Sequence, residues 1–476
     1  VSRMRVPNMS EPETDYLIVG AGAVGMAFAD TLVAESDAHV TIVDRRGKPG
    51  GHWNDAYAFV TLHQPSACYG VNSMELGSGR KDAIGLNQGL YELASGPEIC
   101  GYFDRVMQQT LLPSGRLSYY PMSDYLGDGR IVSILSGAET RVRVRRKVVD
   151  ARYQSPSVPA THTPKFEIGA GVSLVPPGAL PQLWHRQGER PRRFVIIGAG
   201  KTAMDVGIWL IGAGAPADAI SWVVPRDAWL LNRAHTQTGL DFFAETIGSQ
   251  ADQMGALAAA TSANDLFERL EACGAVLRID RSRQPTMFHL ATASAGEVEV
   301  LRSIRNVIRM GHLRSIERDR LRLDEGVVAL GADTLCIDCS ASAVESRSIQ
   351  PIFQGDRLVL QMSRLPQPCF SAALAAHLEL RGDDDRVKNE LCAPVPFPHT
   401  PQAYVGAIRV SMQNQARWGQ DQELRQWIRA SRLDGYGRLM ASADREDPAQ
   451  QALVARFRAG VMAAMANMPR LMAALS

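Results

Sequence analysis

The stretch LIVGAGAVG at residues 17–25 decides the fold of the first part of the chain, and FVIIGAGKTA at residues 194–203 repeats its pattern. Each is a short apolar run that breaks into a glycine-rich turn and continues as an apolar, helix-compatible segment. A dinucleotide pyrophosphate needs this order, because a tight turn, a bare backbone and a helix N-terminus together offer N–H groups and a positive dipole end. One such turn is weak evidence, whereas two predict electron transfer between a flavin and a nicotinamide.

Composition narrows the class of protein. The 476 residues are too many for one hydrophobic core, so we expect two or three domains. A hydrophobic content of 45% and a charged content of 21% are typical of a soluble globular protein. The formal charge of +1 gives no general attraction to nucleic acid or to an acidic membrane.

No targeting signal is evident in the sequence. No apolar run approaches the ~20 residues of a transmembrane helix, and residues 1–10 lack the apolar core of a secretory signal, so we interpret them as a frayed leader. Seven irregularly spaced cysteines fit a reducing compartment better than a disulfide framework. We therefore expect a cytoplasmic protein that binds neither membrane nor nucleic acid.

The first fingerprint opens a predicted β–α–β unit, with a strand at 16–19, a helix at 24–34 and a second strand at 40–43 that ends at Asp44. Its three glycines, Gly20, Gly22 and Gly25, serve the sharp turn, the approach of the pyrophosphate and close helix–strand packing. The Asp44 carboxylate can accept hydrogen bonds from an adenosine ribose and would repel a 2′-phosphate. Since all these parts fall in register, a bound dinucleotide is favoured over an empty glycine-rich loop, with Arg45 or Arg46 covering the adenine side.

Downstream lies the segment Gly50-Gly51-His52-Trp53. Here the chain resembles the class B flavin monooxygenases, which comprise the flavin-containing monooxygenases, the N-hydroxylases and the Baeyer–Villiger enzymes. In that family the first fingerprint binds FAD, and a Gly-Gly-x-Trp segment follows the ribose-binding acid. The resemblance implies that Gly51, His52 and Trp53 line the flavin.

The second fingerprint has the features of an NADPH site. Ala203 stands where a third glycine would, a replacement common in such sites. Arg226 follows the second strand of this unit, where an NAD site places an acid, and its guanidinium can pair with a 2′-phosphate. An ordinary surface arginine is the other interpretation of Arg226. Lys201 and Thr202 add a charge and a hydroxyl at the helix start.

Other elements follow from periodicity and turn residues. Alternation at 141–145 predicts one half-exposed strand, with a basic nucleic-acid stripe as the alternative. The helical stretch 241–273 could cap a substrate pocket, form a dimer surface or belong to the core. The remaining predicted elements are a helix from Ser95 to about Gln109, a proline-rich linker at 156–181, strands at 194–197 and 220–224 around a helix at 202–211, two short strands flanking Gly311 and Arg320, a buried strand at 334–339 and amphipathic helices over 421–476.

The family inserts its NADPH domain into its FAD domain and returns through a strand that ends in Ala-Thr-Gly. Residues 333–341 resemble that return strand, with Cys-Ser-Ala in place of the triplet. We therefore expect an α/β fold with two Rossmann-like dinucleotide-binding domains. The expected ranges are 11–165 for the first part of the FAD domain, 185–325 for the NADPH domain with a helical insert, and 326–476 for the return part and C-terminal helices.

Cys336 and Cys339 have the C-x-x-C spacing of a redox pair. Residues three apart in a strand point to opposite faces, which argues against a disulfide between them. No histidines and carboxylates have metal-ligand spacing on a helix, so no metal is expected.

The resemblance implies oxygenation through a C4a-(hydro)peroxyflavin formed from reduced flavin and O2. Relatives place a polar residue near it from the segment after Gly-Gly-x-Trp, which makes His63 and Gln64 the candidates here; a hydrogen-bonded loop histidine is the other interpretation of His63. A helix that begins near Ser371 could direct its N-terminus at the flavin.

We expect an FAD- and NADPH-dependent monooxygenase that inserts one atom of O2 into a small organic substrate. The Baeyer–Villiger signature is missing from residues 166–184, which favours N- or S-oxygenation. An NADPH-dependent flavoprotein reductase and a non-catalytic nucleotide redox sensor remain alternatives, and a homodimer is possible. The candidate catalytic residues are His63 and Gln64, and the candidate cofactor-binding residues are Gly20, Gly22, Ala23, Val24, Gly25, Asp44, Arg45, Gly51, His52, Trp53, Gly198, Gly200, Lys201, Thr202, Ala203, Arg226 and Ser371.

Overall fold

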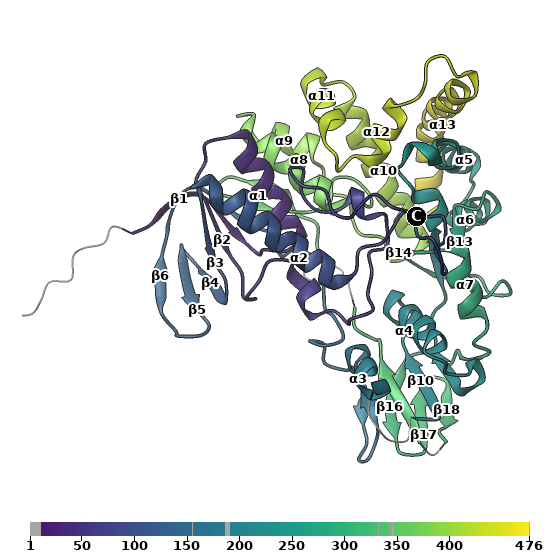
Figure 1. Cartoon of the computed structure of the whole chain (residues 1–476). Coiled ribbons are helices and arrows are strands. Elements are labelled where there is room, and N and C mark those ends of the chain that lie inside the picture. Colours follow the sequence, from purple (N-terminus) through teal and green to yellow (C-terminus); the bar gives the residue numbers. More distant parts are fainter. Residues whose placement is uncertain are drawn as a thin grey trace, which may run out of the picture.

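The computed structural model describes residues 11–154, 156–185, 191–331, 333–342, 344 and 347–475. The predicted leader at 1–10 lies outside the described residues. Figure 1 shows a sheet with its covering helices on the left, a second sheet below on the right, and a group of helices above it.

The first sheet contains the first fingerprint. Its strand order is β20-β21-β7-β1-β2-β3, and β1 lies parallel to both β2 and β7. Helix α1 packs against α8 and is buried on nearly all sides, as its almost uniformly apolar sequence requires. The bounds are β1 Glu13–Val19, β2 Val40–Val43, β3 Leu117–Tyr120, β7 Arg143–Asp150, β20 Phe353–Gln354, β21 Arg357–Val359, α1 Ala23–Glu35, α2 Gly96–Val106 and α8 Pro368–Leu380.

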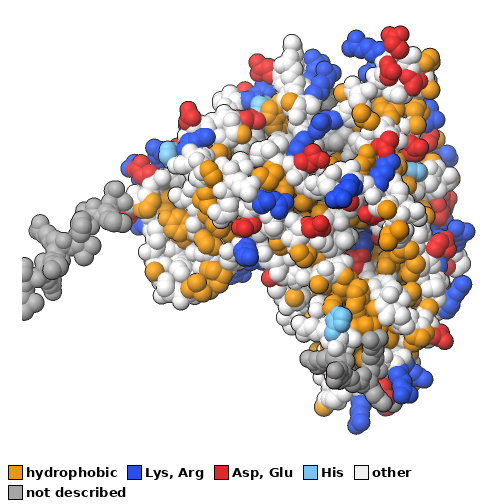
Figure 2. Space-filling model, viewed as in Figure 1, with side chains coloured by type: hydrophobic (Ala, Val, Ile, Leu, Met, Phe, Trp, Pro, Cys, Tyr) orange, Lys and Arg blue, Asp and Glu red, His pale blue; other side chains and the backbone are white. Residues whose placement is uncertain are grey.

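A three-stranded antiparallel sheet of β4 (Ser123–Gly127), β5 (Arg130–Ser133) and β6 (Glu139–Arg141) precedes β7. The single strand predicted at 141–145 is therefore wrong. The chain changes sheets at Val142, which is only 3% exposed, so the alternation of charges spans the end of one strand and the start of another. Figure 2 shows hydrophobic side chains over this part of the molecule.

The second sheet contains the second fingerprint. It has the order β15-β11-β10-β19-β9, and every pairing in it is parallel. All its strands come between β7 and β21 in the sequence, so the second Rossmann-like unit is inserted into the first, as predicted. The bounds are β9 Leu174–Val175, β10 Arg193–Ile197, β11 Ile220–Val223, β15 Asn306–Ile308, β19 Thr334–Asp338 and α4 Lys201–Gly212.

The inserted unit is larger than the sequence indicated. The predicted linker at 156–181 contributes β9 to the second sheet and β8 to a neighbouring one, and four strands rather than two lie between α7 (Ala295–Arg302) and β19. The strand predicted to return the chain, now β19, pairs with β10, whereas β21 is the strand that rejoins the first sheet. The additional strands are β8 Glu167–Ile168, β12 Ala228–Asn232, β13 Val276–Leu277, β14 Met287–Ala293, β16 Leu313–Glu317, β17 Arg320–Leu323 and β18 Gly326–Ala329.

The stretch predicted to be helical at 241–273 forms α5 (Phe243–Ala259) and α6 (Ala263–Ala272). Of the alternatives for this stretch, the structure supports the core, because α5 packs along α13 (Pro448–Ala473) and both helices share one hydrophobic cluster. The other helices are α3 Leu180–His185, α9 Asp385–Leu391, α10 Pro401–Trp418, α11 Gln422–Ala430 and α12 Gly435–Ala441.

Candidate functional site

The first glycine turn does not admit a side chain at Gly20 or Gly25. Gly20 has a φ of +112°, which L side chains rarely adopt, and a Cβ on Gly25 would lie 2.0 Å from the carbonyl oxygen of Gly20. No side chain caps the N-terminus of α1 at Ala23 and Val24, and its first turn contains no acid. The turn therefore leaves N–H groups for an anion, as a dinucleotide pyrophosphate requires.

Asp44 shapes this turn. One carboxylate oxygen accepts a hydrogen bond from the backbone N–H of Ala21 at 2.7 Å, and the other accepts one from the backbone N–H of Arg46, also at 2.7 Å. Each oxygen keeps a lone pair that can accept from a ribose hydroxyl. Arg45 is exposed and forms an ion pair with Asp124, at 3.2 Å between Nη2 and Oδ1.

Tyr119 is a polar group near Asp44 that the sequence reasoning missed. Its hydroxyl is buried and has no hydrogen-bond partner among the described residues. Burial and the nearby Asp44 carboxylate raise the pKa of Tyr119, so the hydroxyl keeps its proton as a donor. An unpartnered buried donor beside the predicted ribose-binding acid fits the adenosine half of a dinucleotide. The one indication in the sequence was that Tyr119 lies on β3, the strand that follows β2.

The Gly-Gly-x-Trp segment packs directly on the first turn. The backbone N–H of Gly50 donates to the carbonyl of Ala21 at 2.8 Å, and a Cβ on Gly51 would lie 2.9 Å from the Cα of Gly22. The indole N–H of Trp53 donates to the hydroxyl of Tyr69 at 2.8 Å. This motif therefore needs its glycines for close backbone contact with the fingerprint.

His52 lies beside this contact. Burial, reinforced by the positive charge of Arg46, lowers its pKa to about 4. The imidazole is therefore neutral at physiological pH, and it can hydrogen-bond a ligand without adding charge.

The second glycine turn is more open than the first. Gly198 has a φ of +120°, and a Cβ there would lie 2.6 Å from the carbonyl oxygen of Cys339. A Cβ on Gly200, in contrast, would have no neighbour within 4 Å. Ala203 is fully buried in the core of this unit, and no side chain caps α4. The turn presents a bare backbone to solvent, as an exchangeable nucleotide requires.

The two cationic candidates at this turn differ in their surroundings. Lys201 forms an ion pair with Asp205, one turn further along α4. Thr202, the residue after Lys201, contacts the hydroxyl of Tyr57. Arg226 is exposed and forms no hydrogen bond or ion pair with any described residue.

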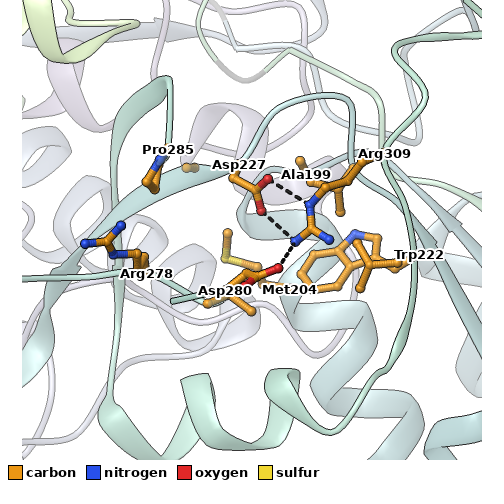
Figure 3. Close-up of a pocket in the computed structure, with 12 residues that line it drawn as sticks. Ala199, Met204, Trp222, Asp227, Arg278, Asp280, Pro285 and Arg309 are labelled. Atoms are coloured by element: carbon orange, nitrogen blue, oxygen red, sulfur yellow. Dashed lines mark hydrogen bonds and ion pairs between the residues drawn. The ribbon is translucent and has the colours of Figure 1, made fainter. Parts of the chain in front are cut away.

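A pocket opens at the carboxyl ends of β10, β11 and β15, where Rossmann folds bind nucleotides (Figure 3). Asp227, the residue after Arg226, points into it and receives two hydrogen bonds from Arg309, both at 2.9 Å. The sequence reasoning missed both residues, although Arg309 follows β15 as Arg226 follows β11. The pocket is lined by Ala199, Met204, Trp222, Val224, Asp227, Ala228, Arg278, Ile279, Asp280, Pro285, Val307 and Arg309.

The segment after Gly-Gly-x-Trp connects the two units. The hydroxyl of Tyr57 donates to Asp205 on α4 at 2.7 Å, and the ring of Phe59 stacks on Trp209 of the same helix at 5.2 Å. The backbone carbonyl of His63 accepts from Arg233 at 3.2 Å. The candidate segment thus runs from the first cradle onto the helix of the second.

His63 lies among charged groups of the inserted unit. Burial and the positive charges of Lys201 and Arg233 lower its pKa to about 3. Arg233 is itself fully buried and pairs with Glu297 at 2.8 Å, a cluster that no sequence pattern indicated. His63 is therefore neutral at physiological pH and can exchange hydrogen bonds but not act as a cationic acid.

Gln64 and Ser371 differ in availability. The Gln64 side chain makes no hydrogen bond to any described residue. The Ser371 hydroxyl is fully buried, accepts from the N–H of Ser363 at 3.0 Å and donates to the carbonyl of Gln367 at 2.7 Å. Helix α8 begins where predicted, but this serine serves its first turn.

The two cysteines of the C-x-x-C spacing, Cys336 and Cys339, form no disulfide. Both are free thiols in the buried part of the inserted unit. Over the part of the chain that the structure describes, no helix combines the length and the apolar character needed to cross a membrane.

The chain has similarities to known proteins in sequence and in fold. A family model described as an NAD(P)-binding Rossmann-like domain matches residues 18–76, which hold the first fingerprint and the Gly-Gly-x-Trp segment. Among solved structures, the chain is similar to a polycyclic ketone monooxygenase from Thermothelomyces thermophila (12% identity, 96% of this chain and 90% of that one, TM-score 0.49). It is also similar to an open crystal structure of cyclohexanone monooxygenase (15% identity, 91% and 98%, TM-score 0.46).

Two curated relatives are much more similar in sequence. They are Uncharacterized protein Rv2000 of Mycobacterium tuberculosis and Uncharacterized protein Mb2023 of Mycobacterium bovis. Each is 46% identical over 446 residues, which cover 94% of this chain and 82% of the relative. The chain belongs to the family of these mycobacterial proteins, with two Rossmann-like units, one inserted in the other.

Proposed function

We propose that the protein is an FAD- and NADPH-dependent monooxygenase that inserts one atom of O2 into a small organic substrate, with nitrogen or sulfur as the favoured acceptor. FAD belongs to the first cradle, formed by residues 20–25 with Asp44 and the segment 50–53. NADPH belongs to the second cradle, formed by residues 198–203 with Arg226.

The observation that carries this proposal is the segment 57–63, which joins the two cradles. It leaves the first turn at Trp53 and is fixed to α4 by Tyr57 and Phe59. Two dinucleotide sites connected by one short, partly buried segment favour hydride transfer between their ligands over two independent binding functions. This argues against a protein that only senses nucleotides.

The residues of the chain have distinct roles in this scheme. The N-termini of α1 and α4 hold the two pyrophosphates, and Asp44 and Tyr119 orient the first adenosine. Bound FAD would supply the centre that takes up a hydride and reacts with O2, and bound NADPH would supply that hydride. His52 and His63 offer neutral hydrogen-bonding groups near the junction, and Gln64 offers an unused amide. The apolar packing of Trp53 and Phe59 limits the entry of water.

The test is oxygen accounting. Purified protein reconstituted with FAD is supplied with NADPH and a panel of amines, sulfides and ketones, and NADPH loss, O2 uptake, hydrogen peroxide and oxygenated product are measured together. The proposal expects at least one amine or sulfide that yields one product per NADPH with little peroxide. Return of all consumed O2 as peroxide with every substrate would instead identify a reductase. Absence of NADPH consumption would leave only nucleotide binding.

A further inference from the structure

The pocket at the ends of β10, β11 and β15 has one apolar side and one charged side. Met204, Trp222 and Val224 are nearly fully buried and form the apolar side. The indole N–H of Trp222 donates to the carbonyl of Gly198 at 2.7 Å, which fixes this ring against the fingerprint turn. A fixed apolar slot beside the turn suits a flat nucleobase.

At the centre of the charged side, one arginine, Arg309, lies between two carboxylates. Arg309 directs Nε and Nη2 at Asp227, and Nη2 also lies 3.0 Å from Oδ2 of Asp280. Figure 3 shows the guanidinium between the two acids. These three groups sum to one net negative charge, and Arg278, which also lines the pocket and is paired with Glu271, adds a second positive charge.

The two acids hold Arg309 differently. Asp227 immediately precedes β12, and its carbonyl accepts hydrogen bonds from the N–H groups of Thr286 and Met287, so it is tied into the backbone of this unit. Asp280 reaches Arg309 from the loop between β13 and β14 through a single ion pair, and its other carboxylate oxygen accepts hydrogen bonds from the backbone N–H and the hydroxyl of Ser282. Asp280 therefore holds Arg309 more weakly than Asp227 does, with one contact against two.

Arg309 also retains donors for a ligand. A guanidinium has five N–H donors, and no hydrogen bond among the described residues uses Nη1. A phosphate could therefore bind at Nη1 while Asp227 keeps its two bonds. Asp280, as a like charge, would oppose that phosphate.

We propose that this pocket takes the adenosine end of the nicotinamide dinucleotide, and that Arg309 and Asp280 set the preference for a 2′-phosphate in opposite directions. Arg309 attracts the phosphate through Nη1, and Asp280 disfavours it by repulsion and by holding the guanidinium. This inference rests on the proposed function, because it assigns the nucleotide specificity of the second cradle. The proposal thus names Arg309 and Asp280, beside the exposed Arg226, as residues that govern binding of the 2′-phosphate.

The experiment measures binding rather than turnover. Isothermal titration calorimetry with the full chain compares 2′,5′-ADP with 5′-AMP, and NADPH with NADH, at one ionic strength. The variants are Asp280→Asn and Arg309→Gln. The matched control is Asp324→Asn, which removes a carboxylate from another arginine pair of the inserted unit, with Arg314, outside the pocket. Thermal unfolding of each variant identifies any loss of folding.

For Asp280→Asn we expect NADPH and 2′,5′-ADP to bind about fivefold tighter, since one repulsive charge is worth about 1 kcal/mol at a partly exposed site. NADH and 5′-AMP should change less than about twofold, and Asp324→Asn should change neither pair. Arg309→Gln should weaken the 2′-phosphorylated ligands about tenfold, the scale of a lost charge-assisted pair.

The inference would be overturned if Asp280→Asn changed the affinity for both classes of ligand equally, or changed neither. In that case NADPH oxidation by the wild type would still leave the proposed function intact. Wild-type protein that binds 2′,5′-ADP no better than 5′-AMP would also overturn it. Failure of the wild type to bind any of the four nucleotides would overturn the proposed function and this inference together.

Discussion

The two glycine turns have the same local sequence, but the structure surrounds them differently. In the first, Gly22 is covered by the backbone of Gly51, and α1 is buried on nearly all sides. In the second, a Cβ added to Gly200 would meet nothing within 4 Å, and Lys201 and Thr202 remain partly exposed. The difference lies at the second glycine of each turn: the protein's own chain packs on Gly22, whereas Gly200 is exposed to solvent.

This difference matches the different demands on two redox coenzymes. A flavin that remains bound through many turnovers gains from a closed cradle, because its release would require the covering segment to move. A nicotinamide dinucleotide that enters and leaves in each turnover needs an accessible turn. Packing therefore favours the flavin in the first unit and the nicotinamide in the second, independently of the acid and arginine that follow the two second strands.

The largest effect should come from the glycines themselves. Gly25→Ala should destabilise the protein by about 3 kcal/mol or more, because the new Cβ meets the carbonyl oxygen of Gly20 at 2.0 Å and backbone cannot yield cheaply. Gly200→Ala should change stability by less than about 0.5 kcal/mol, since its Cβ meets nothing. Urea unfolding measures both. Equal losses in the two variants would contradict the close contact between Gly25 and the carbonyl of Gly20.

Asp44 should matter for both the turn and its ligand. Asp44→Ala leaves the buried N–H of Ala21 unpaired, at a cost of about 1–3 kcal/mol, and removes the ribose acceptor. We expect purified protein that is colourless and regains flavin only at high FAD concentration, as measured by absorbance after desalting. Asp124→Ala, which removes the exposed partner of Arg45, is the control and should remain yellow. A yellow Asp44→Ala protein would contradict the placement of FAD in the first cradle.

Arg226 tests the open cradle. Because it is exposed and unpaired among the described residues, Arg226→Ala should leave stability unchanged. It should weaken NADPH by about 1–3 kcal/mol, the scale of a charge-assisted hydrogen bond, and leave NADH nearly unchanged. Fluorescence titration with both nucleotides separates the outcomes. The same loss for both would show that Arg226 does not contact the 2′-phosphate.

A smaller effect is expected at His63, at the junction between the cradles, where the lowered pKa makes the free energy of unfolding depend on pH. Its pKa is about 3 in the folded protein, whereas an unfolded histidine takes a proton near pH 6.5. Below pH 6.5 the unfolded state therefore binds more protons, and stability falls as the pH falls towards 3. His63→Gln should reduce this slope by up to about 1.4 kcal/mol per pH unit.

Urea unfolding at several values between pH 6.5 and 4.5 measures that slope. His39→Gln, at an exposed histidine of the first unit, is the matched control and should leave the slope as it is in the wild type. An unchanged slope in His63→Gln would mean that His63 takes up a proton in the folded protein.

The sequence was most informative where local chemistry determines the backbone. Both strand–turn–helix units and helix α2 formed as predicted, because glycine, apolar runs and the Ser95–Glu98 capping box act over a few residues. The insertion of one unit in the other was expected from the family resemblance alone. The break at Val142 was missed because alternation continues across a change of sheet. The short strands β8 and β9 were missed because their pairing partners lie far along the chain.

The site shows the same limit. The glycines and Asp44 could be named in advance, since their roles follow from one β–α–β unit. Asp227, Arg309 and Asp280 meet only because three separate segments end at one corner of the second sheet. Arg233 and Glu297 pair between two further segments, and Tyr119 acquires its buried hydroxyl from the packing of a neighbouring strand. Such contacts depend on tertiary structure, which no spacing in the sequence encodes.

The central claim is that the two cradles hold a flavin and a nicotinamide close enough to exchange a hydride. Anaerobic mixing of the FAD-loaded protein with NADPH in a stopped-flow spectrophotometer tests it most directly. The account predicts that the visible absorption of the oxidised flavin bleaches with saturable dependence on NADPH concentration, and more slowly in Arg226→Ala at subsaturating NADPH. A protein that binds both coenzymes while the flavin stays oxidised would contradict the account.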